Sequence, residues 1–131
     1  VPDLGATLVA FPNGALLNIK KTDFRDDQIL IRATTGIGQL GLPTDRFSPL
    51  SLAGVVLSAG GLGKLNVDEI NRVLAGHVFS TSYGQGGDSY SLGGSTRPED
   101  LELTLQLMTA YLTDPGLRAA PLERMKAAYL Q

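Results

Sequence analysis

The chain has 131 residues, of which 43% are hydrophobic and 18% are charged, and its formal net charge is −2. This fits one globular domain with its own core, and the weak negative charge excludes a global field that would attract nucleic acid. Because the chain has no cysteine and only one histidine, His77, disulfides, thiolate metal sites and metal sites with two histidine ligands are excluded within it.

The N-terminal third of the chain predicts three strands. Apolar runs over Thr7–Phe11 and Ala15–Lys20 flank Asn13-Gly14, a pair that favours a tight hairpin turn because both residues tolerate a positive φ. Gln28–Thr34 alternates in polarity, which indicates a mostly buried strand. We expect the glycine-rich segment Gly36–Arg46 to form a loop.

Two helices are expected next. Ser48-Pro49 is a typical helix start, with a hydroxyl at the N-cap and proline at the first helical position, and Gly60-Gly61 ends that helix. The helix over Asn66–Gly76 has the clearest signals, because Asn66 and Glu69 match a capping box and a glycine follows the last turn. Its inward side chains are expected to be Ile70, Val73 and Leu74.

The C-terminal half predicts two strands and then a helix. Val78–Tyr83 and Ser89–Gly93 read as strands on either side of a glycine-rich turn at 84–87. Thr96 and Glu99 match a second capping box, with Pro98 in the first turn. We expect these residues to open a helix that reaches residue 112.

Leucines at 101, 103, 105 and 107 also alternate, so a strand is possible there, although the cap and the length favour a helix. On that helix one face would carry Leu101, Leu105, Met108 and Leu112. Asp114-Pro115-Gly116 ends it, and a last helix is expected to start at Pro121. One side of this last helix would carry Leu122, Met125 and Tyr129.

The order of these elements predicts an α+β fold, with a largely antiparallel sheet and helices packed on one face. No repeat, linker or low-complexity tract divides the chain, so residues 1–131 are expected to form a single domain. The longest uncharged run, Phe47–Gly63, has 17 residues and is interrupted by proline, serines and glycines. No membrane insertion is therefore expected.

One glycine motif has the spacing of a dinucleotide-binding loop. Gly36-x-Gly38-x-x-Gly41 follows a predicted strand, as that motif requires. The glycines of such a loop open a helix whose N-terminus holds the pyrophosphate, and an acidic residue follows about 20 residues later. Here Pro43 and Pro49 delay the helix, and no acidic residue occurs between Arg46 and Val67. A plain glycine loop is the favoured interpretation.

Two further motifs match only in part. Gly63-Lys64 resembles the end of a P-loop, but serine and leucine stand at 58 and 65 where that motif needs glycine and Ser/Thr. Gly87-Asp88-Ser89 resembles part of a serine-hydrolase motif, but residue 91 is serine, and the only histidine that could act as its base is His77. A helix-ending loop and a polar hairpin turn are the favoured interpretations.

The remaining candidates are charged residues. His77 follows a helix-ending glycine, where the helix dipole favours a surface histidine over a metal ligand. Asp23, Asp26 and Asp27 cluster without the spacing of an EF-hand, so a solvated turn is expected. No catalytic, cofactor-binding or metal-binding residue is assigned to this chain.

Four segments in this order resemble one protein family: Phe11–Ile29, Leu74–Val78, Gly93–Glu102 and Leu105–Pro115. They include the opening Asn-Gly with Lys-x-Thr-Asp-Phe at 13–24, and the pattern Leu-x-Gly-x-x-x-Pro-x-Asp-Leu-Glu at 92–102 before a long helix. Over nearly its whole length the chain is similar to a domain of the pitrilysin/insulinase-type zinc metallopeptidases, the inverzincins.

The resemblance implies the fold of mitochondrial-processing-peptidase-like metallohydrolases, in which homologous α+β domains enclose a chamber. In the catalytic domain of that family, H-x-x-E-H binds zinc and activates water. The corresponding helix here would lie within Phe47–Lys64, which contains no His, Asp or Glu. The resemblance therefore implies a non-catalytic copy, most like the domain that opens the C-terminal half. It carries over no catalytic residue, and Arg97 and Tyr90 receive no substrate-binding role.

The function that the resemblance implies is architectural. The chain would be part of a longer, periplasmic zinc metalloendopeptidase, packed against its other domains and helping to wall a chamber around a peptide or small protein. Zinc is expected only in the catalytic domain of the parent, so this chain alone is expected to be inactive. The alternatives are a stand-alone module that binds an extended peptide at a sheet edge, or a nucleotide-binding enzyme that uses Gly36–Gly41.

Overall fold

Five strands and four α-helices occur in the part of the chain that the computed structural model describes, residues 5–43 and 53–129. All strand pairs are antiparallel, and the predicted α+β class is confirmed. Short 3₁₀ turns cover Gly38–Gly41 and Pro98–Asp100. The elements are β1 (Ala6–Ala10), β2 (Leu16–Lys20), β3 (Ile29–Thr35), α1 (Ala53–Gly60), α2 (Val67–Val73), β4 (Phe79–Gln85), β5 (Tyr90–Thr96), α3 (Leu101–Thr113) and α4 (Ala119–Tyr129).

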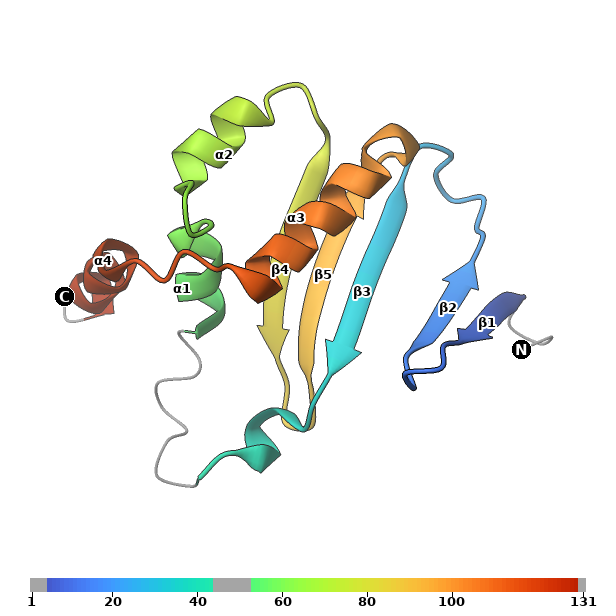
Figure 1. The fold of residues 1–131 in the computed structure, drawn as a ribbon, viewed down its shortest axis with the longest axis horizontal. Coiled ribbons are helices and arrows are strands. Elements are labelled where there is room, and N and C mark those ends of the chain that lie inside the picture. Colours follow the sequence, from blue (N-terminus) through green and yellow to red (C-terminus); the bar gives the residue numbers. More distant parts are fainter. Residues whose placement is uncertain (1–4, 44–52, 130–131) are drawn as a thin grey trace.

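The strands form two sheets instead of the single sheet that was expected. β1 pairs with β2, and β5 lies between β3 and β4, so the β1–β2 hairpin stands apart from the three-stranded sheet (Figure 1). The hairpin turn predicted at Asn13-Gly14 is confirmed: Gly14 has a φ of 86°, and the Phe11 N–H donates to the Ala15 carbonyl at 2.9 Å.

The register of the three-stranded sheet decides which side chains meet the helices. Ile29 of β3 and Phe79 of β4 both lie opposite Thr96 of β5, and side chains alternate between the two faces along each strand. The face with Leu92 and Thr96, both buried, packs under α3 (Figure 1). Both predicted C-terminal strands are confirmed, although they extend to residues 85 and 96.

The apolar core lies between this sheet face, α2 and α3. Its buried centre is Ile70 of α2 with Leu107 and Tyr111 of α3. Burying one such side chain contributes about 1.5–3 kcal/mol, so this small cluster fixes the position of both helices. Partly buried residues that pack against it are Leu57, Leu62, Leu65, Leu74 and Phe79.

The prediction that Thr96 caps α3 is wrong. Thr96 is the last residue of β5, and its buried hydroxyl donates to the Val78 carbonyl at 2.9 Å. The chain enters α3 through the 3₁₀ turn at 98–100, whose N-cap residue Arg97 makes no side-chain cap bond. The Thr-x-x-Glu pattern misled because the bond to Val78 keeps the threonine in the sheet.

The buried face of α3 also differs from the prediction. Leu105 and Leu112 are 45% and 59% exposed, whereas the buried positions are Thr104, Leu107, Met108 and Tyr111. The physical reason lies in β5: a Cβ on Gly94 would be 3.1 Å from the Met108 sulfur and 3.6 Å from Thr104 Cγ2. The bare glycine lets this face of the helix sit close to the sheet.

The capping box of α2 is confirmed. The Glu69 N–H donates to Asn66 Oδ1 at 2.9 Å, and the Asn66 N–H donates to the Glu69 carboxylate at 2.8 Å. Gly76, with a φ of 95°, follows the helix as expected. Val73 was expected to face inward but is 67% exposed, because it lies at the rim of a pocket between α2 and α3.

The limits of the other helices follow the predictions in part. The start predicted at Ser48-Pro49 lies outside the described residues, and α1 is described from Ala53 to its predicted end at Gly60. The last helix begins at Ala119 instead of Pro121. The Arg118 guanidinium donates to the carbonyls of Gly60 and Leu62. These bonds hold the residue before α4 against the end of α1.

Candidate functional site

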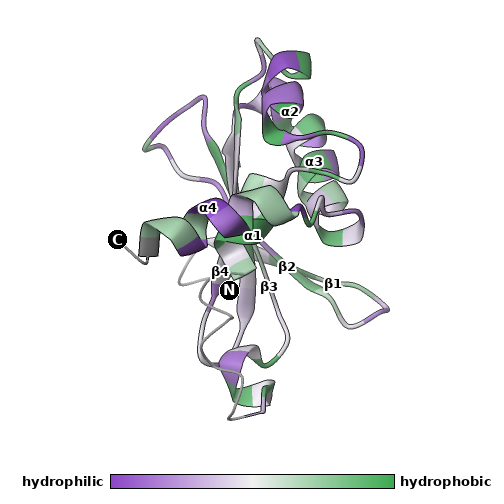
Figure 2. Cartoon of the chain, turned by 90° about the vertical axis from the view of Figure 1, so that its left-hand side faces the viewer, coloured by the Kyte–Doolittle hydropathy of each residue, from purple (hydrophilic) through white to green (hydrophobic). Residues whose placement is uncertain are grey.

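The second face of the three-stranded sheet is open among the described residues. In Figure 2 the sheet is seen edge-on with α3 on one side of it, and Ser80 and Ser82 on the other face are exposed. The residues on this open sheet face are small and mostly polar. By the strand register they are Leu30, Arg32, Thr34, Ser80, Ser82, Gly84, Ser91, Gly93 and Ser95.

Glycines opposite serines keep the open sheet face flat. A Cβ on Gly93 would lie 2.8 Å from Ser82 Oγ, and a Cβ on Gly84 would lie 2.7 Å from Ser91 Oγ. Arg32 is the single charged residue on this face, and no described acidic residue pairs with it. The face therefore offers hydroxyl groups and one cation to water or to a polar partner, and little apolar area for packing.

A pocket of about 450 Å³ lies between α1 and β4. The described lining residues are uncharged, and they are Gln39, Gly54, Val55, Ser58, Thr81, Ser82, Tyr83 and Gln85. Tyr83 stacks on Tyr90, with ring centroids 6.3 Å apart, and the pKa of Tyr83 is raised, first by burial and then by Tyr90. The raised pKa keeps the Tyr83 phenol neutral at ordinary pH, and none of the other described lining residues is charged, so this pocket provides no charge to a ligand.

Gln85 is the unusual group in this pocket. Its Nε2 and Oε1 atoms are both shielded from water, and neither has a hydrogen-bond partner. A buried polar group without a partner costs about 1–3 kcal/mol, so such a group in a folded protein calls for an explanation. Sequence analysis missed it, because a glutamine at the end of a strand gives no signal of its own.

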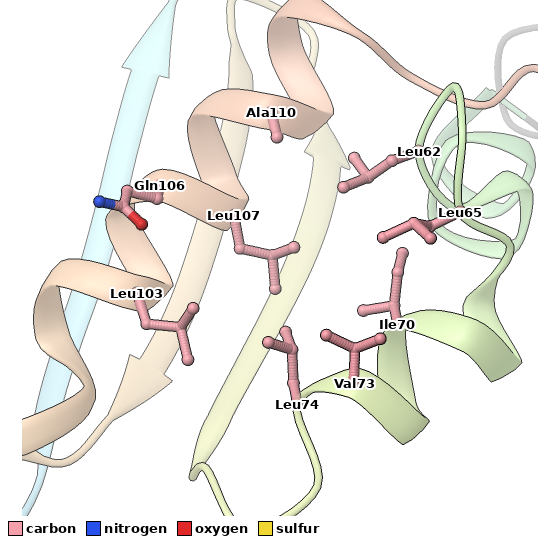
Figure 3. A pocket seen from close by; sticks show the side chains of 9 residues that line it. All are labelled: Leu62, Leu65, Ile70, Val73, Leu74, Leu103, Gln106, Leu107 and Ala110. Atoms are coloured by element: carbon pink, nitrogen blue, oxygen red, sulfur yellow. The ribbon is translucent and has the colours of Figure 1, made fainter.

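A second, apolar pocket of about 210 Å³ opens between α2 and α3. Figure 3 shows apolar side chains of α2, of α3 and of the loop before α2 pointing into it. Gln106 supplies the only polar side chain of the described lining. The remaining residues that line it are Leu62, Leu65, Ile70, Val73, Leu74, Leu103, Leu107 and Ala110. Such a pocket suits an apolar side chain and lacks groups for acid–base chemistry.

Asp100 is the centre of a buried polar cluster at the start of α3. Its carboxylate lies 2.5 Å from His77 Nδ1, and it accepts bonds from the Val78 N–H at 2.8 Å and from Arg97 Nε at 2.6 Å. The His77 hydrogen bond, followed by that of Val78, lowers the pKa of Asp100 from 3.8 to about 2. Arg97 also reaches the Gly76 carbonyl at 3.2 Å, so the cluster joins the end of α2 to α3.

His77 therefore has a structural partner. Its side chain is 48% exposed, as expected for a surface histidine after a helix, but no sequence pattern indicated Asp100 as its partner. Ser89 lies in the turn at the far end of the β4–β5 hairpin from His77, with its hydroxyl on Asp88 at 3.1 Å. The partial hydrolase motif Gly87-Asp88-Ser89 is thus not brought together with a base.

The glycine loop after β3 is hydrogen-bonded to the turn between β4 and β5. Gly36 and Gly38 have φ values of 75° and 54°, and the short 3₁₀ turn at 38–41 opens no α-helix before residue 43. The N–H groups of Gln39 and Leu40 instead donate to the carbonyls of Gly86 and Gly87 in the β4–β5 turn. The plain-loop interpretation of Gly36–Gly41 agrees with this geometry.

The other candidates lie apart from one another. Gly63-Lys64 is in the loop between α1 and α2, where the Gly63 N–H donates to the Asp114 carbonyl. The aspartates at 23, 26 and 27 are exposed in the loop between β2 and β3. No group of three His, Asp or Glu side chains among the described residues could hold a metal ion. The donor set of the described chain therefore does not fit zinc, and α1 offers no ligand.

Structural comparison finds this fold in parts of larger proteases. The periplasmic protease PqqL from Escherichia coli matches with a TM-score of 0.84 and 23% identity, over 95% of this chain and 14% of PqqL. The ferredoxin protease FusC, in complex with Arabidopsis ferredoxin, matches with a TM-score of 0.71 and 18% identity, over 88% of this chain and 13% of FusC. A protease from Helicobacter pylori matches with a TM-score of 0.66 and 12% identity, over 86% of this chain and 27% of that protease.

These matches define the class of fold to which the chain belongs. Its fold also occurs within each of these proteases, which agrees with the resemblance to the pitrilysin/insulinase type. The chain spans between 13% and 27% of the lengths of these proteases. No known protein-family profile matches the sequence, and no curated protein sequence does. No helix in the described ranges is long and apolar enough to cross a membrane.

Proposed function

We propose that this chain is a non-catalytic structural domain of a zinc-dependent metalloendopeptidase and helps to form its substrate chamber. The observation that carries the proposal is the match to PqqL, which takes in 95% of this chain but only 14% of that protease. A single histidine cannot make H-x-x-E-H, so zinc and the general base belong to another domain of the parent protein. Residues 1–131 then act as one inactive unit.

The two sides of the domain support this role. The open sheet face is polar and suits a wall that faces water and substrate, whereas the β1–β2 hairpin exposes apolar side chains and suits packing against a neighbouring domain (Figure 2). An isolated two-stranded hairpin is only marginally stable in water, so the hairpin gains from such a neighbour. Its exposed apolar residues include Leu8, Leu16, Leu17 and Ile19.

The proposed substrate is a peptide or small protein, and the proposed compartment is the periplasm. FusC was solved with a protein bound, and PqqL is a periplasmic protease, which supports both inferences for a parent of the same fold. The alternative function, a stand-alone module that binds an extended peptide, is favoured by one observation: β4 has an unpaired outer edge within the described part of the chain.

A peptidase assay tests the proposal directly. The purified chain is incubated with an unfolded, fluorescently labelled casein, with and without added zinc, beside the purified native parent protein. We expect no cleavage by the chain in either condition and zinc-dependent cleavage by the parent. Cleavage by the chain itself, abolished by a chelator, would contradict the proposal.

A further inference from the structure

The turn of the β1–β2 hairpin contains two residues that can react with each other. Asn13 and Gly14 are both exposed, so water and hydroxide reach them. The backbone nitrogen of the residue after an asparagine can attack the carboxamide carbon Cγ, and a side chain on that residue hinders the approach. Gly14 has no side chain, and even a Cβ there would meet nothing within 4 Å. The turn therefore leaves room for a cyclic imide to form.

The hydrogen bonding of the Asn13 side chain favours this attack. Its Oδ1 atom accepts the Ala15 N–H at 3.1 Å. This bond polarises the carboxamide and stabilises the negative charge that develops on the oxygen when Cγ is attacked, as an oxyanion-hole donor does. The leaving group is Nδ2, and no residue within 5–43 or 53–129 accepts a hydrogen bond from it. The ammonia that departs is therefore not held by the protein.

One hydrogen bond restrains the attacking nitrogen. The Gly14 N–H donates to the Phe11 carbonyl at 3.0 Å, and this bond must open before the nitrogen reaches Cγ. A two-stranded hairpin is only marginally stable by itself, and in the described part of the chain β1 and β2 pair only with each other. The turn therefore opens more often than the three-stranded sheet and its helices do.

The other three asparagines of the chain lack this combination. Asn18 lies within β2 and precedes an isoleucine. Asn66 is held by both bonds of the capping box and precedes a valine. Asn71 lies within α2 and precedes an arginine. At each of these positions a side chain hinders the next backbone nitrogen, so the reaction should select the hairpin turn.

We propose that Asn13 is a site of spontaneous deamidation that ends in aspartate and isoaspartate. Hydroxide removes the proton from the Gly14 nitrogen, which then forms a bond to Asn13 Cγ. The Cγ–Nδ2 bond breaks, and Nδ2 leaves as ammonia after taking a proton from water. Water then adds to either carbonyl of the cyclic imide and opens the ring. This modification goes beyond the proposed function, which assigns no chemistry to the turn.

The isoaspartate product changes the hairpin itself. Its main chain runs through Cβ, so the turn gains one backbone atom. The Phe11 N–H and the Ala15 carbonyl, which close the hairpin at 2.9 Å, then lose their alignment. We expect the strands of the modified hairpin to separate, which frees the backbone amides of β1 and β2 for exchange with solvent.

The test follows the purified natural chain, kept folded in mildly alkaline buffer. Peptide mapping by mass spectrometry locates each deamidated residue, and an isoaspartyl methyltransferase assay measures isoaspartate. We expect Asn13 to react at least about tenfold faster than Asn18, Asn66 or Asn71. Asn13→Gln should remove the signal, because a longer side chain needs a larger ring. Asn71→Gln is the matched control and should leave the signal unchanged.

Two results would overturn the proposal: a rate at Asn13 no greater than that at Asn18 or Asn71, or an isoaspartate signal that persists in Asn13→Gln. The comparison of sites is made within the natural chain, so it does not depend on whether a variant folds. Hydrogen exchange of the aged sample reports on the hairpin, and amide protection in β1 and β2 should fall while that in β5 stays. Failure of this proposal leaves the structural role untouched, because that role is judged by the mass and zinc content of the native protein.

Discussion

Asp100 shows how one residue can join two segments that are separate in the sequence, residues 77–78 and 97–104. Its carboxylate holds the side chains of His77 and Arg97 and the backbone of Val78, and its own carbonyl accepts the buried Thr104 hydroxyl at 2.9 Å. A buried carboxylate is tolerated only when charged and polar partners surround it. The cluster therefore fixes the start of α3 against the link between α2 and β4.

The lowered pKa of Asp100 makes stability depend on pH. Because this pKa is about 2 in the folded chain and 3.8 without its partners, the contribution of Asp100 is complete above pH 3.8 and is lost as the pH falls towards 2. We expect the free energy of unfolding, measured by urea denaturation, to fall over this interval. Asp100→Asn should destabilise the chain at neutral pH and reduce that acid-induced fall.

Glu99→Gln is the matched control for Asp100. The Glu99 side chain is 73% exposed and lies 3.7 Å from Arg97 Nε, so its charge contributes little. This variant should keep both the stability and the pH profile of the natural chain. An equal loss of stability in the two variants would show that Asp100 is not the centre of the cluster.

Gly94 tests how closely α3 packs on the sheet. A Cβ there would lie 2.8 Å from the Ser80 carbonyl oxygen and 3.1 Å from the Met108 sulfur, so Gly94→Ala forces backbone or side chains to move. We expect a loss of about 1–3 kcal/mol in the free energy of unfolding. Gly87→Ala, where a Cβ meets nothing within 4 Å, should change it by less than about 0.5 kcal/mol.

At the scale of elements, the start of α2 is determined by residues of its own first turn. The reciprocal bonds of Asn66 and Glu69 satisfy two backbone N–H groups at its first turn. Asn66→Ala should therefore cost about 1 kcal/mol in thermal or urea unfolding. Asn71→Ala, an exposed position within the same helix, should be neutral or slightly stabilising because alanine favours helices. Equal losses at both positions would contradict a role for the cap.

Elements whose signals are local could be predicted, and those decided by distant contacts could not. The hairpin at Asn13-Gly14 and the capping box of α2 depend on neighbouring residues, and both are confirmed. Thr96 carries the same cap pattern, but its bond to Val78 keeps it in β5. The buried face of α3 likewise depends on a glycine of another element, which no helical period within 101–113 reveals.

The candidate sites divide in the same way. The alternation of serine in β4 and β5 was visible in the sequence and would have indicated the open sheet face, had the register been known. The pocket of Gln85 and the partners of Asp100 arise only from the tertiary arrangement, since Asp100 meets a histidine 23 residues away. Sequence reasoning could place the single histidine at the surface but could not find its partner.

At the scale of the whole molecule, the chain presents a polar sheet face, an apolar hairpin and a fold found as a small part of larger proteases. The apolar hairpin agrees with a domain that packs against neighbours. The absence of a second histidine prevents the two-histidine zinc site of the inverzincins from forming in this chain. Together these features support a structural role within a longer metalloendopeptidase.

The most direct test of this account is the intact mass of the native polypeptide, measured with a peptide map upstream of Val1 and with the zinc content of the same sample. We expect a mass several times 13.8 kDa, an upstream peptide that contains H-x-x-E-H, and bound zinc. A native mass near 13.8 kDa would contradict the account and make the stand-alone peptide-binding module the leading function.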